Sequence, residues 1–79
     1  MNSDAHFAIC VANDGADDLQ VRKVYRVLPD ETGAQHAMIR VIDDSGEDYL
    51  YPRELFLPIA LPPSAEAKLE EVLAAGSAA

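Results

Sequence analysis

The stretch MIRVIDDSGEDYLY, residues 38–51, contains two apolar segments on either side of a polar one. MIRVI (38–42) and DYLY (48–51) are rich in β-branched and aromatic residues, which favour strands. The polar segment DDSGE (43–47) between them has the composition of a tight turn. The pattern predicts two antiparallel strands joined by a short turn, and it is the clearest hairpin signal in the chain.

Further strand signals lie on both sides of this hairpin. FAICVA (7–12) alternates large and small apolar residues, as expected of a strand with neighbours on both sides. FLPIAL (56–61) is another apolar segment, and Pro58 places it at a sheet edge or a bulge because proline cannot donate to a ladder. PREL (52–55) predicts a single tight turn before this last strand.

The segment LQVRKVYRVL (19–28) fits two structures. As a helix it would bring apolar residues at i, i+3, i+4 and i+7 onto one face, with Asp17 or Asp18 as the N-cap. Its valines and tyrosine prefer strands, and the alternation also holds if the chain bends at Arg22-Lys23. We expect the bent strand pair, and the helix stays the alternative.

Two polar segments connect these elements. NDGADD (13–18) predicts a turn, because Asn, Asp and Gly tolerate positive φ. PDETGAQH (29–36) predicts a connection with one short helical turn opened by Asp30.

The predicted order of elements over residues 7–61 resembles an SH3-like barrel. It consists of five short strands, with a bend in the second, a tight hairpin and a one-turn helix before the last strand. The resemblance implies a mainly β domain, a small SH3-like barrel of about five antiparallel strands followed by a short C-terminal α-helix. It also implies that one set of large side chains is largely buried: Ile9, Val11, Val27, Ile39, Val41, Tyr51 and Phe56.

Eukaryotic SH3 domains that bind Pro-rich peptides carry Tyr-x-Pro-x-x-Tyr before the last strand. The matching positions here are Leu50, Pro52 and Leu55, so only the proline carries over, and the chain has no tryptophan. Pro-rich recognition depends on stacked aromatic rings, so we do not expect it. We keep these three residues as candidate contacts with a protein partner.

The tyrosines of GEDYLYP (46–52) have two interpretations. Under the barrel alignment Tyr51 points inward and Tyr49 shares its face, so both belong to core and rim, with hydroxyls on polar partners. The alternative is an exposed aromatic docking surface. We favour the structural interpretation.

A second resemblance is one of local sequence. KVYRVLPDE (23–31) and RVIDDSGEDYLYP (40–52) resemble segments of a group of small uncharacterised bacterial proteins. This resemblance implies one compact bacterial domain and no particular chemistry.

The C-terminal segment predicts a spacer and a helix over residues 62–75. Pro62-Pro63 stops the sheet, Ser64 is a good N-cap, and Gly76 is a plausible end signal. We expect residues 1–6 to be a flexible N-terminus and residues 76–79 to be a disordered tail.

A helix of about 12 residues is marginal alone in water, so this one must pack on something. Leu69 and Leu73 lie on its apolar side. We expect both to be buried at the barrel edge next to Pro58, and the alternative is that they contact a partner chain.

Catalytic and metal-binding patterns are weak. Ligand spacing for an EF-hand fails in DDSGED (43–48), because Gly46 falls at position 4 instead of 6. His6 and His36 lack neighbours at metal-ligand spacing, and nothing local supports a nucleophile at Cys10. We expect no catalytic activity, no metal and no cofactor.

The net charge of −8, from 14 acidic and 6 basic residues, argues against nucleic acid and anionic membranes as partners. A single cysteine excludes an internal disulfide, and the start has no signal-peptide pattern, so we expect a cytoplasmic protein. We expect a small protein-interaction module that binds a protein partner or itself. The alternative is an acidic decoy or regulator that docks on a basic, nucleic-acid-binding protein.

Overall fold

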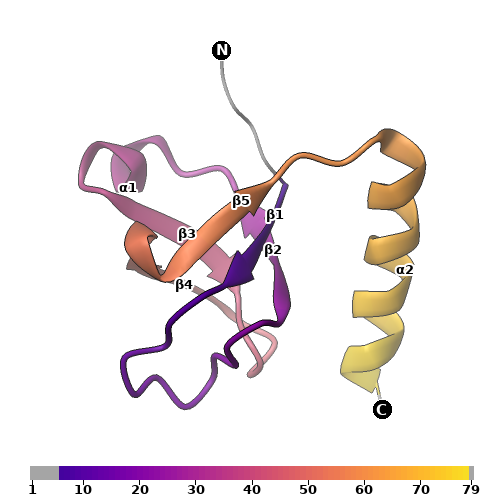
Figure 1. The fold of residues 1–79 in the computed structure, drawn as a ribbon, viewed down its shortest axis with the longest axis horizontal. Coiled ribbons are helices and arrows are strands. Elements are labelled where there is room, and N and C mark those ends of the chain that lie inside the picture. The colour runs from indigo at the N-terminus through magenta and orange to yellow at the C-terminus, as the bar shows by residue number, and fades with distance from the viewer. Residues whose placement is uncertain (1–5, 79) are drawn as a thin grey trace.

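The structure is a computed structural model that describes residues 6–78, with side chains described for residues 6–73. Its elements, in chain order, are β1 (Phe7–Cys10), β2 (Val24–Leu28), α1 (Glu31–Gln35), β3 (Met38–Ile42), β4 (Asp48–Pro52), the 3₁₀ turn η1 (Arg53–Leu55), β5 (Phe56–Ile59) and α2 (Pro63–Ala78). All strand pairs are antiparallel and form one five-stranded sheet of order β4-β3-β2-β1-β5. The mainly β fold with a C-terminal helix is confirmed (Figure 1).

The strand order and the 3₁₀ turn before β5 are consistent with the SH3-like barrel that the sequence predicts. The barrel is not closed, because no ladder joins β4 to β5 within residues 6–78. The sheet therefore has two edges, one at each of these strands, and these edges decide what can pair with the domain.

The predicted hairpin over residues 38–51 is present. β3 and β4 pair in register from Met38 opposite Pro52 to Ile42 opposite Asp48. The turn between them passes through Gly46 at φ +87°, a conformation that glycine adopts without strain. The turn and its register thus agree with the composition of the segment.

Residues 19–28 do not form a helix, which excludes the alternative interpretation. The chain bends at Arg22, whose φ is +77°, and its N–H donates to the Cys10 carbonyl at 2.6 Å. Only the second half of the segment is a strand, β2, whereas residues 19–23 form a turn. Leu19 is buried in the core, so the first half of the segment packs on the core although it is not a strand.

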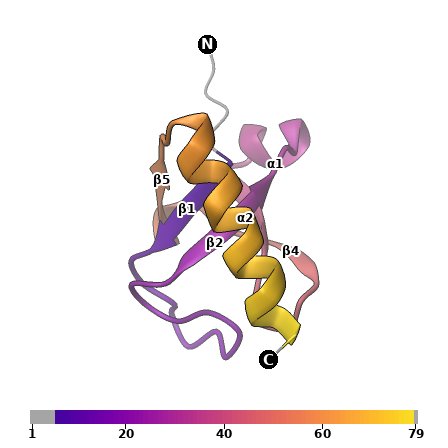
Figure 2. The ribbon, with the colours of Figure 1, turned by 90° about the vertical axis from the view of Figure 1, so that its right-hand side faces the viewer.

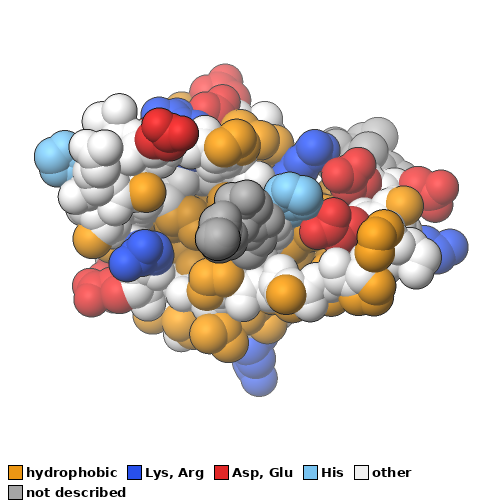
Figure 3. All heavy atoms as spheres, turned by 90° about the horizontal axis from the view of Figure 1, so that it is seen from above, with side chains coloured by type: hydrophobic (Ala, Val, Ile, Leu, Met, Phe, Trp, Pro, Cys, Tyr) orange, Lys and Arg blue, Asp and Glu red, His pale blue; other side chains and the backbone are white. Residues whose placement is uncertain are grey.

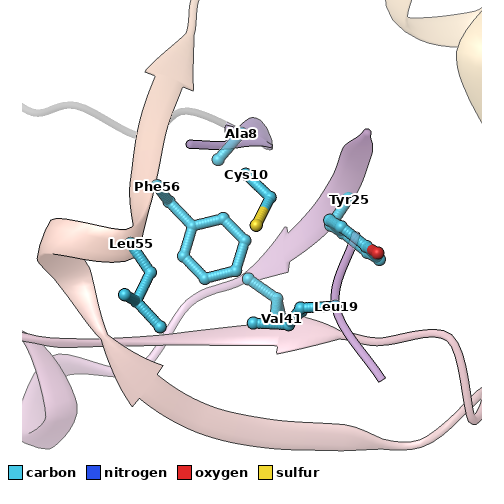
Figure 4. Packing of buried hydrophobic residues seen from close by; sticks show 7 residues of the cluster. All are labelled: Ala8, Cys10, Leu19, Tyr25, Val41, Leu55 and Phe56. Atoms are coloured by element: carbon cyan, nitrogen blue, oxygen red, sulfur yellow. The ribbon is translucent and has the colours of Figure 1, made fainter. Parts of the chain in front are cut away.

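The core lies on the inner face of the curved sheet. Small residues of β1 face a T-shaped pair of rings, Tyr25 and Phe56, whose centroids are 6.1 Å apart. Figure 4 shows the buried side chains pointing toward one another from the strands, from η1 and from the loop before β2. The cluster consists of Ala8, Cys10, Leu19, Tyr25, Val41, Leu55 and Phe56.

The predicted burial is confirmed for Val41 and Phe56 and is wrong for Val11, which is 49% exposed. Four of the predicted core residues are only partly buried, although three of them pack against the core. They are Ile9, Val27, Ile39 and Tyr51. β1 turns its small residues inward because the large rings of β2 and β5 fill the space opposite them. The large residues of β1 consequently lie on the outer face.

α1 is the predicted helical turn, and Asp30 caps it. The Asp30 carboxylate accepts a hydrogen bond from the Gly33 N–H at 2.7 Å. The chain leaves this helix through Ala37, which has φ +59°. A non-glycine residue in this region is strained, so Ala37 marks a place where glycine would fit better.

α2 departs from the prediction at both ends. It begins at Pro63, which suits the first helical position, so Ser64 lies inside the first turn and is not the N-cap. It continues through Gly76 to Ala78, so residues 76–78 are helical where a disordered tail was predicted. Residues 1–5 and 79, which carry the rest of the predicted flexible ends, lie outside the described residues.

α2 lies across the outer face of β1 and β2 instead of at the edge beside Pro58 (Figure 2). Two contacts tie it to the sheet: His6, just before β1, is hydrogen-bonded through Nδ1 to Glu66 Oε1 at 3.0 Å, and Arg26 Nη2 on β2 forms an ion pair with Glu70 Oε2 at 3.5 Å. Figure 3 shows a histidine and acidic side chains side by side near α2. Since three of these four side chains are exposed, each contact contributes little to stability.

Candidate interaction site

The backbone of β4 has one free side, and two hydrogen bonds fix which groups face it. The Asp43 N–H donates to the Glu47 carbonyl at 3.0 Å, and the Arg53 N–H donates to the Ala37 carbonyl at 2.9 Å. In an antiparallel pair, backbone groups alternate between facing the partner strand and facing away from it. Odd-numbered residues of β4 therefore bond to β3. Asp48 and Leu50 turn both their N–H and their C=O toward the open edge, and Pro52 turns its C=O toward it.

The other edge, β5, offers fewer donors. The Val11 N–H donates to the Leu55 carbonyl at 2.8 Å, so the same alternation turns Phe56 and Pro58 toward the open side. Pro58 has no N–H, and the Phe56 N–H already donates to the Arg53 carbonyl. Neither outward residue of β5 has a free donor, whereas β4 offers the N–H groups of Asp48 and Leu50. Of the two predicted positions for Pro58, a sheet edge or a bulge, the structure shows the edge.

The two tyrosines of β4 lie on the inner face and differ in burial. Tyr51 packs on Phe56 with ring centroids 6.2 Å apart, and its hydroxyl donates to Asp43 Oδ2 at 2.6 Å. Tyr49 is 48% exposed, and its hydroxyl donates to Glu47 Oε1 at 2.9 Å. Tyr51 thus follows the structural interpretation, while Tyr49 offers an aromatic ring at the surface beside the open edge.

Asp43 anchors the hairpin turn and is only 5% exposed. Its carboxylate accepts hydrogen bonds from the Ser45 N–H, the Ser45 hydroxyl and the Tyr51 hydroxyl. Burial raises the pKa of Asp43, but these three bonds outweigh burial and hold the pKa below its ordinary value. The buried carboxylate therefore stays ionised and fixes both the turn and the ring of Tyr51.

Asp44 links the same turn to the loop before β2. It accepts hydrogen bonds from Lys23 Nζ at 2.6 Å, from Gln20 Nε2 at 3.0 Å and from the Tyr25 hydroxyl at 3.1 Å. Burial, with a further contribution from the Asp44 carboxylate, raises the pKa of Tyr25 to about 12, although the Gln20 N–H opposes this shift. The first two acids of the turn are thus bonded inside the domain.

Leu50 lies on the outer face of β4 and contacts α1. A Cβ added at Gly33 would lie 2.8 Å from Leu50 Cδ2, so only glycine leaves room for this leucine. Arg40 on β3 ties the same region together, because it bonds Asp30 through Nε and Asp48 through Nη1, each at 2.8 Å. α1 and Arg40 therefore hold β4 in place and leave its edge open.

The predicted partner contacts do not form one surface. Leu50 and Pro52 are exposed on β4, but Leu55 is 3% exposed and belongs to the core. Leu69 and Leu73 are half-buried on α2 and not buried as predicted. Since α2 crosses β1 and β2 while β4 is an edge of the sheet, the two pairs of residues lie apart.

Two shallow hollows accompany these surfaces. One, of about 680 Å³, lies in the opening between β4 and β5 and is lined in part by Met38, Pro52 and Arg53. The other, of about 700 Å³, runs between α2 and the hairpin turn and includes Ile42 and Val72. Both are open to solvent, so they can take a surface segment more readily than an enclosed small molecule.

Other chemistry has little support in the described part of the chain. Within it, no group of three or more His, Cys, Asp or Glu side chains could hold a metal ion. Cys10 is fully buried in the core, and burial raises the pKa of its thiol, which disfavours the reactive thiolate. No helix in residues 6–78 is both long enough and apolar enough to cross a membrane.

Sequence reasoning missed the open edge and the buried carboxylate. The edge depends on the hairpin register, which the sequence of one strand does not fix. The turn-capping role of Asp43 could be predicted from the sequence, because an Asp at the start of a turn often accepts a hydrogen bond from the backbone N–H two residues on. No protein family model, curated protein or solved structure matches this chain. The likeness of residues 23–31 and 40–52 to small bacterial proteins stays a prediction.

Proposed function

We propose that this protein is a small protein-interaction module whose interface is the open edge of β4. The single observation that carries this proposal is the difference between the two sheet edges: within residues 6–78, β4 has free N–H donors at Asp48 and Leu50, whereas neither outward residue of β5 has one. An extended segment of a partner can add a strand to such an edge. The net charge of −8 favours a protein partner over nucleic acid or an anionic membrane. A cytoplasmic location is part of the same proposal.

The side chains beside the edge supply specificity. Main-chain hydrogen bonds give affinity in strand addition, and alternate side chains of the added strand meet the two faces of the sheet. Here the added strand meets the exposed ring of Tyr49 on the inner face and Leu50 with α1 on the outer face. This arrangement favours a partner segment with apolar or aromatic residues on both sides.

The experiment compares Leu50→Pro with Leu50→Ala as affinity baits in native extract. Both remove the leucine side chain, but only proline removes the outward N–H. Because this N–H does not bond to β3, Leu50→Pro leaves the β3–β4 ladder intact, as Pro52 does at the equivalent position. We expect Leu50→Ala to retain the captured partner and Leu50→Pro to lose it, with circular dichroism confirming that both variants fold. Equal capture by the two folded variants would show that the edge is not the interface.

A second candidate function, an acidic decoy for a basic protein, has one observation in its favour. The loop over residues 13–18 and the hairpin turn meet, because the Asp44 N–H donates to the Asp18 carbonyl at 2.9 Å, and both lie at the lower end of Figure 1. Within residues 6–73, no cation forms an ion pair with Asp14, Asp17 or Asp18. Binding that falls steeply between low and high salt, and that Asp17→Asn/Asp18→Asn weakens, would favour the decoy. Binding through the β4 edge should be nearly indifferent to salt.

A further inference from the structure

We infer that the strand which pairs with β4 is β4 of a second copy of this chain, antiparallel to the first and centred on Leu50. This inference rests on the proposed function, since it names the occupant of the same edge. A two-fold axis at Leu50 places each residue of one β4 opposite the residue equally far from Leu50 on the other. The two sheets then join into one continuous sheet.

The hydrogen bonds of this pairing follow from the outward groups. The two copies of Leu50 face each other as a hydrogen-bonded pair, and each N–H donates to the opposite carbonyl. The next outward pair sets Asp48 opposite Pro52 of the second copy. The Asp48 N–H donates to that proline carbonyl, while proline has no donor to return. The pairing thus uses every free N–H of the β4 edge, and Pro52 ends it on both sides.

The charges at the ends of β4 are complementary under this symmetry. Glu47 and Arg53 lie three residues to either side of Leu50, so each Glu47 comes opposite Arg53 of the second copy. Both are exposed and both are still in the ladder with β3. Within residues 6–73, neither side chain forms an ion pair. The pairing therefore forms two ion pairs, one at each end of β4, and places no like charges opposite each other along the strand.

The side chains of the two faces match as well. On the inner face, Tyr49 comes opposite Tyr51 of the second copy, in the closer, non-hydrogen-bonded type of pair. Aromatic pairs across strands are favourable, and the exposed Tyr49 ring is the one that gains contact. On the outer face the two Leu50 side chains, each against its own α1, come together. An edge occupied in this way no longer exposes strand donors to other chains.

The test is the mass in solution of the full chain, measured by sedimentation equilibrium over a wide concentration range. We expect wild type to pass from 8.5 kDa to twice that mass. Arg53→Glu places two carboxylates opposite each other at each end of the paired strands and should weaken dimerisation at least about tenfold. Glu47→Arg opposes two arginines and should do the same. The double variant Glu47→Arg/Arg53→Glu restores both pairs and should recover the wild-type dissociation constant.

Arg22→Glu is the matched control, because it makes the same charge change at another exposed arginine that is in the bend before β2. It should dimerise like wild type. Dimerisation that ignores Arg53→Glu, or that the double variant does not recover, overturns the inference. A wild type that stays at 8.5 kDa also overturns it. If the Leu50→Pro and Leu50→Ala baits still differ in that case, the edge function stands and its occupant is another protein. If they capture equally, both ideas fail.

Discussion

Removing the Tyr51 hydroxyl should destabilise the domain far more than removing that of Tyr49. The Tyr51 hydroxyl donates to Asp43 at 2.6 Å, a short distance typical of a charge-assisted bond, and Asp43 is 5% exposed. A bond to a charged group is worth about 1.5–3 kcal/mol, and a buried acceptor that loses its donor incurs the cost of desolvation. We therefore expect Tyr51→Phe to lower the free energy of unfolding by about 2 kcal/mol, since phenylalanine keeps the ring against Phe56.

The assay is urea or thermal unfolding followed by circular dichroism. For a domain of this size, 1 kcal/mol shifts the midpoint of thermal unfolding by about 4–8 °C, so Tyr51→Phe should lower it by roughly 8–16 °C. Tyr49→Phe is the matched control, because its hydroxyl bonds an exposed carboxylate, and it should unfold like wild type. A double-mutant cycle with Asp43→Asn should show clear coupling to Tyr51. Equal midpoints for the two Phe variants, or no coupling, would show that the Tyr51 hydroxyl does not stabilise the domain through Asp43.

The same pair gives a pH dependence with a definite sign. The pKa of Asp43 is lower in the folded domain than its unfolded value of about 3.9, although burial opposes the lowering. A lowered pKa stabilises the fold above the unfolded value, and this stabilisation is lost as pH falls through the folded value. The stability difference between wild type and Tyr51→Phe should be full at neutral pH and shrink below about pH 4. A difference that grows on acidification would contradict the assignment of Asp43 as the ionised partner.

Three further results are expected. Ala37→Gly should stabilise the domain by about 0.5–1 kcal/mol in urea unfolding, because φ +59° suits glycine, whereas Ala34→Gly within α1 should destabilise it. Leu69→Ala should lower the free energy of unfolding by about 1 kcal/mol, since this side chain is half-buried. Val72→Ala should change it very little, because Val72 is 55% exposed. Equal losses for the two variants would mean that α2 does not pack through the face that carries Leu69. Calcium at about 1 mM should leave the amide spectra of residues 43–48 unchanged, and a saturable shift there would reveal a cation site.

Local signals in the sequence predict much of this fold. The hairpin over 38–51, the turn at PREL and the edge position of Pro58 each follow from residues with a narrow set of backbone conformations. The Asp30 cap of α1 is of the same kind. These features could be predicted because each depends on a few neighbouring residues.

The predictions that were wrong concern features that depend on residues distant in the chain. The residues of β1 are apolar on both faces of the strand. The alternation of large and small residues therefore predicts a strand but does not show which face points into the core. The rings of Tyr25 and Phe56 make that choice, because only Ala8 and Cys10 are small enough to lie opposite them. The docking of α2 likewise depends on which strands it meets and not on its own apolar side.

The candidate site was partly predictable. The residues of β4 are recognisable as a strand from their composition, and the SH3-like pattern indicates Leu50 and Pro52. Which backbone groups face outward depends on the register that the turn sets, and a shift of one residue would turn the other set to the edge. The hydrogen bond from the Asp43 N–H to the Glu47 carbonyl fixes that register.

We expect the N–H groups of β4 at Asp48 and Leu50 to be free in the isolated domain and to become paired on association. Amide hydrogen exchange followed by NMR tests it most directly, with Tyr49 and Tyr51 as internal controls whose N–H groups bond to β3. In dilute protein we expect Leu50 to exchange fast beside two protected tyrosine amides. On raising the protein concentration, or on saturation with a captured partner, Leu50 should become protected to the level of its neighbours. A Leu50 amide already protected in the dilute monomer, or one that still exchanges fast in the complex, would contradict the account.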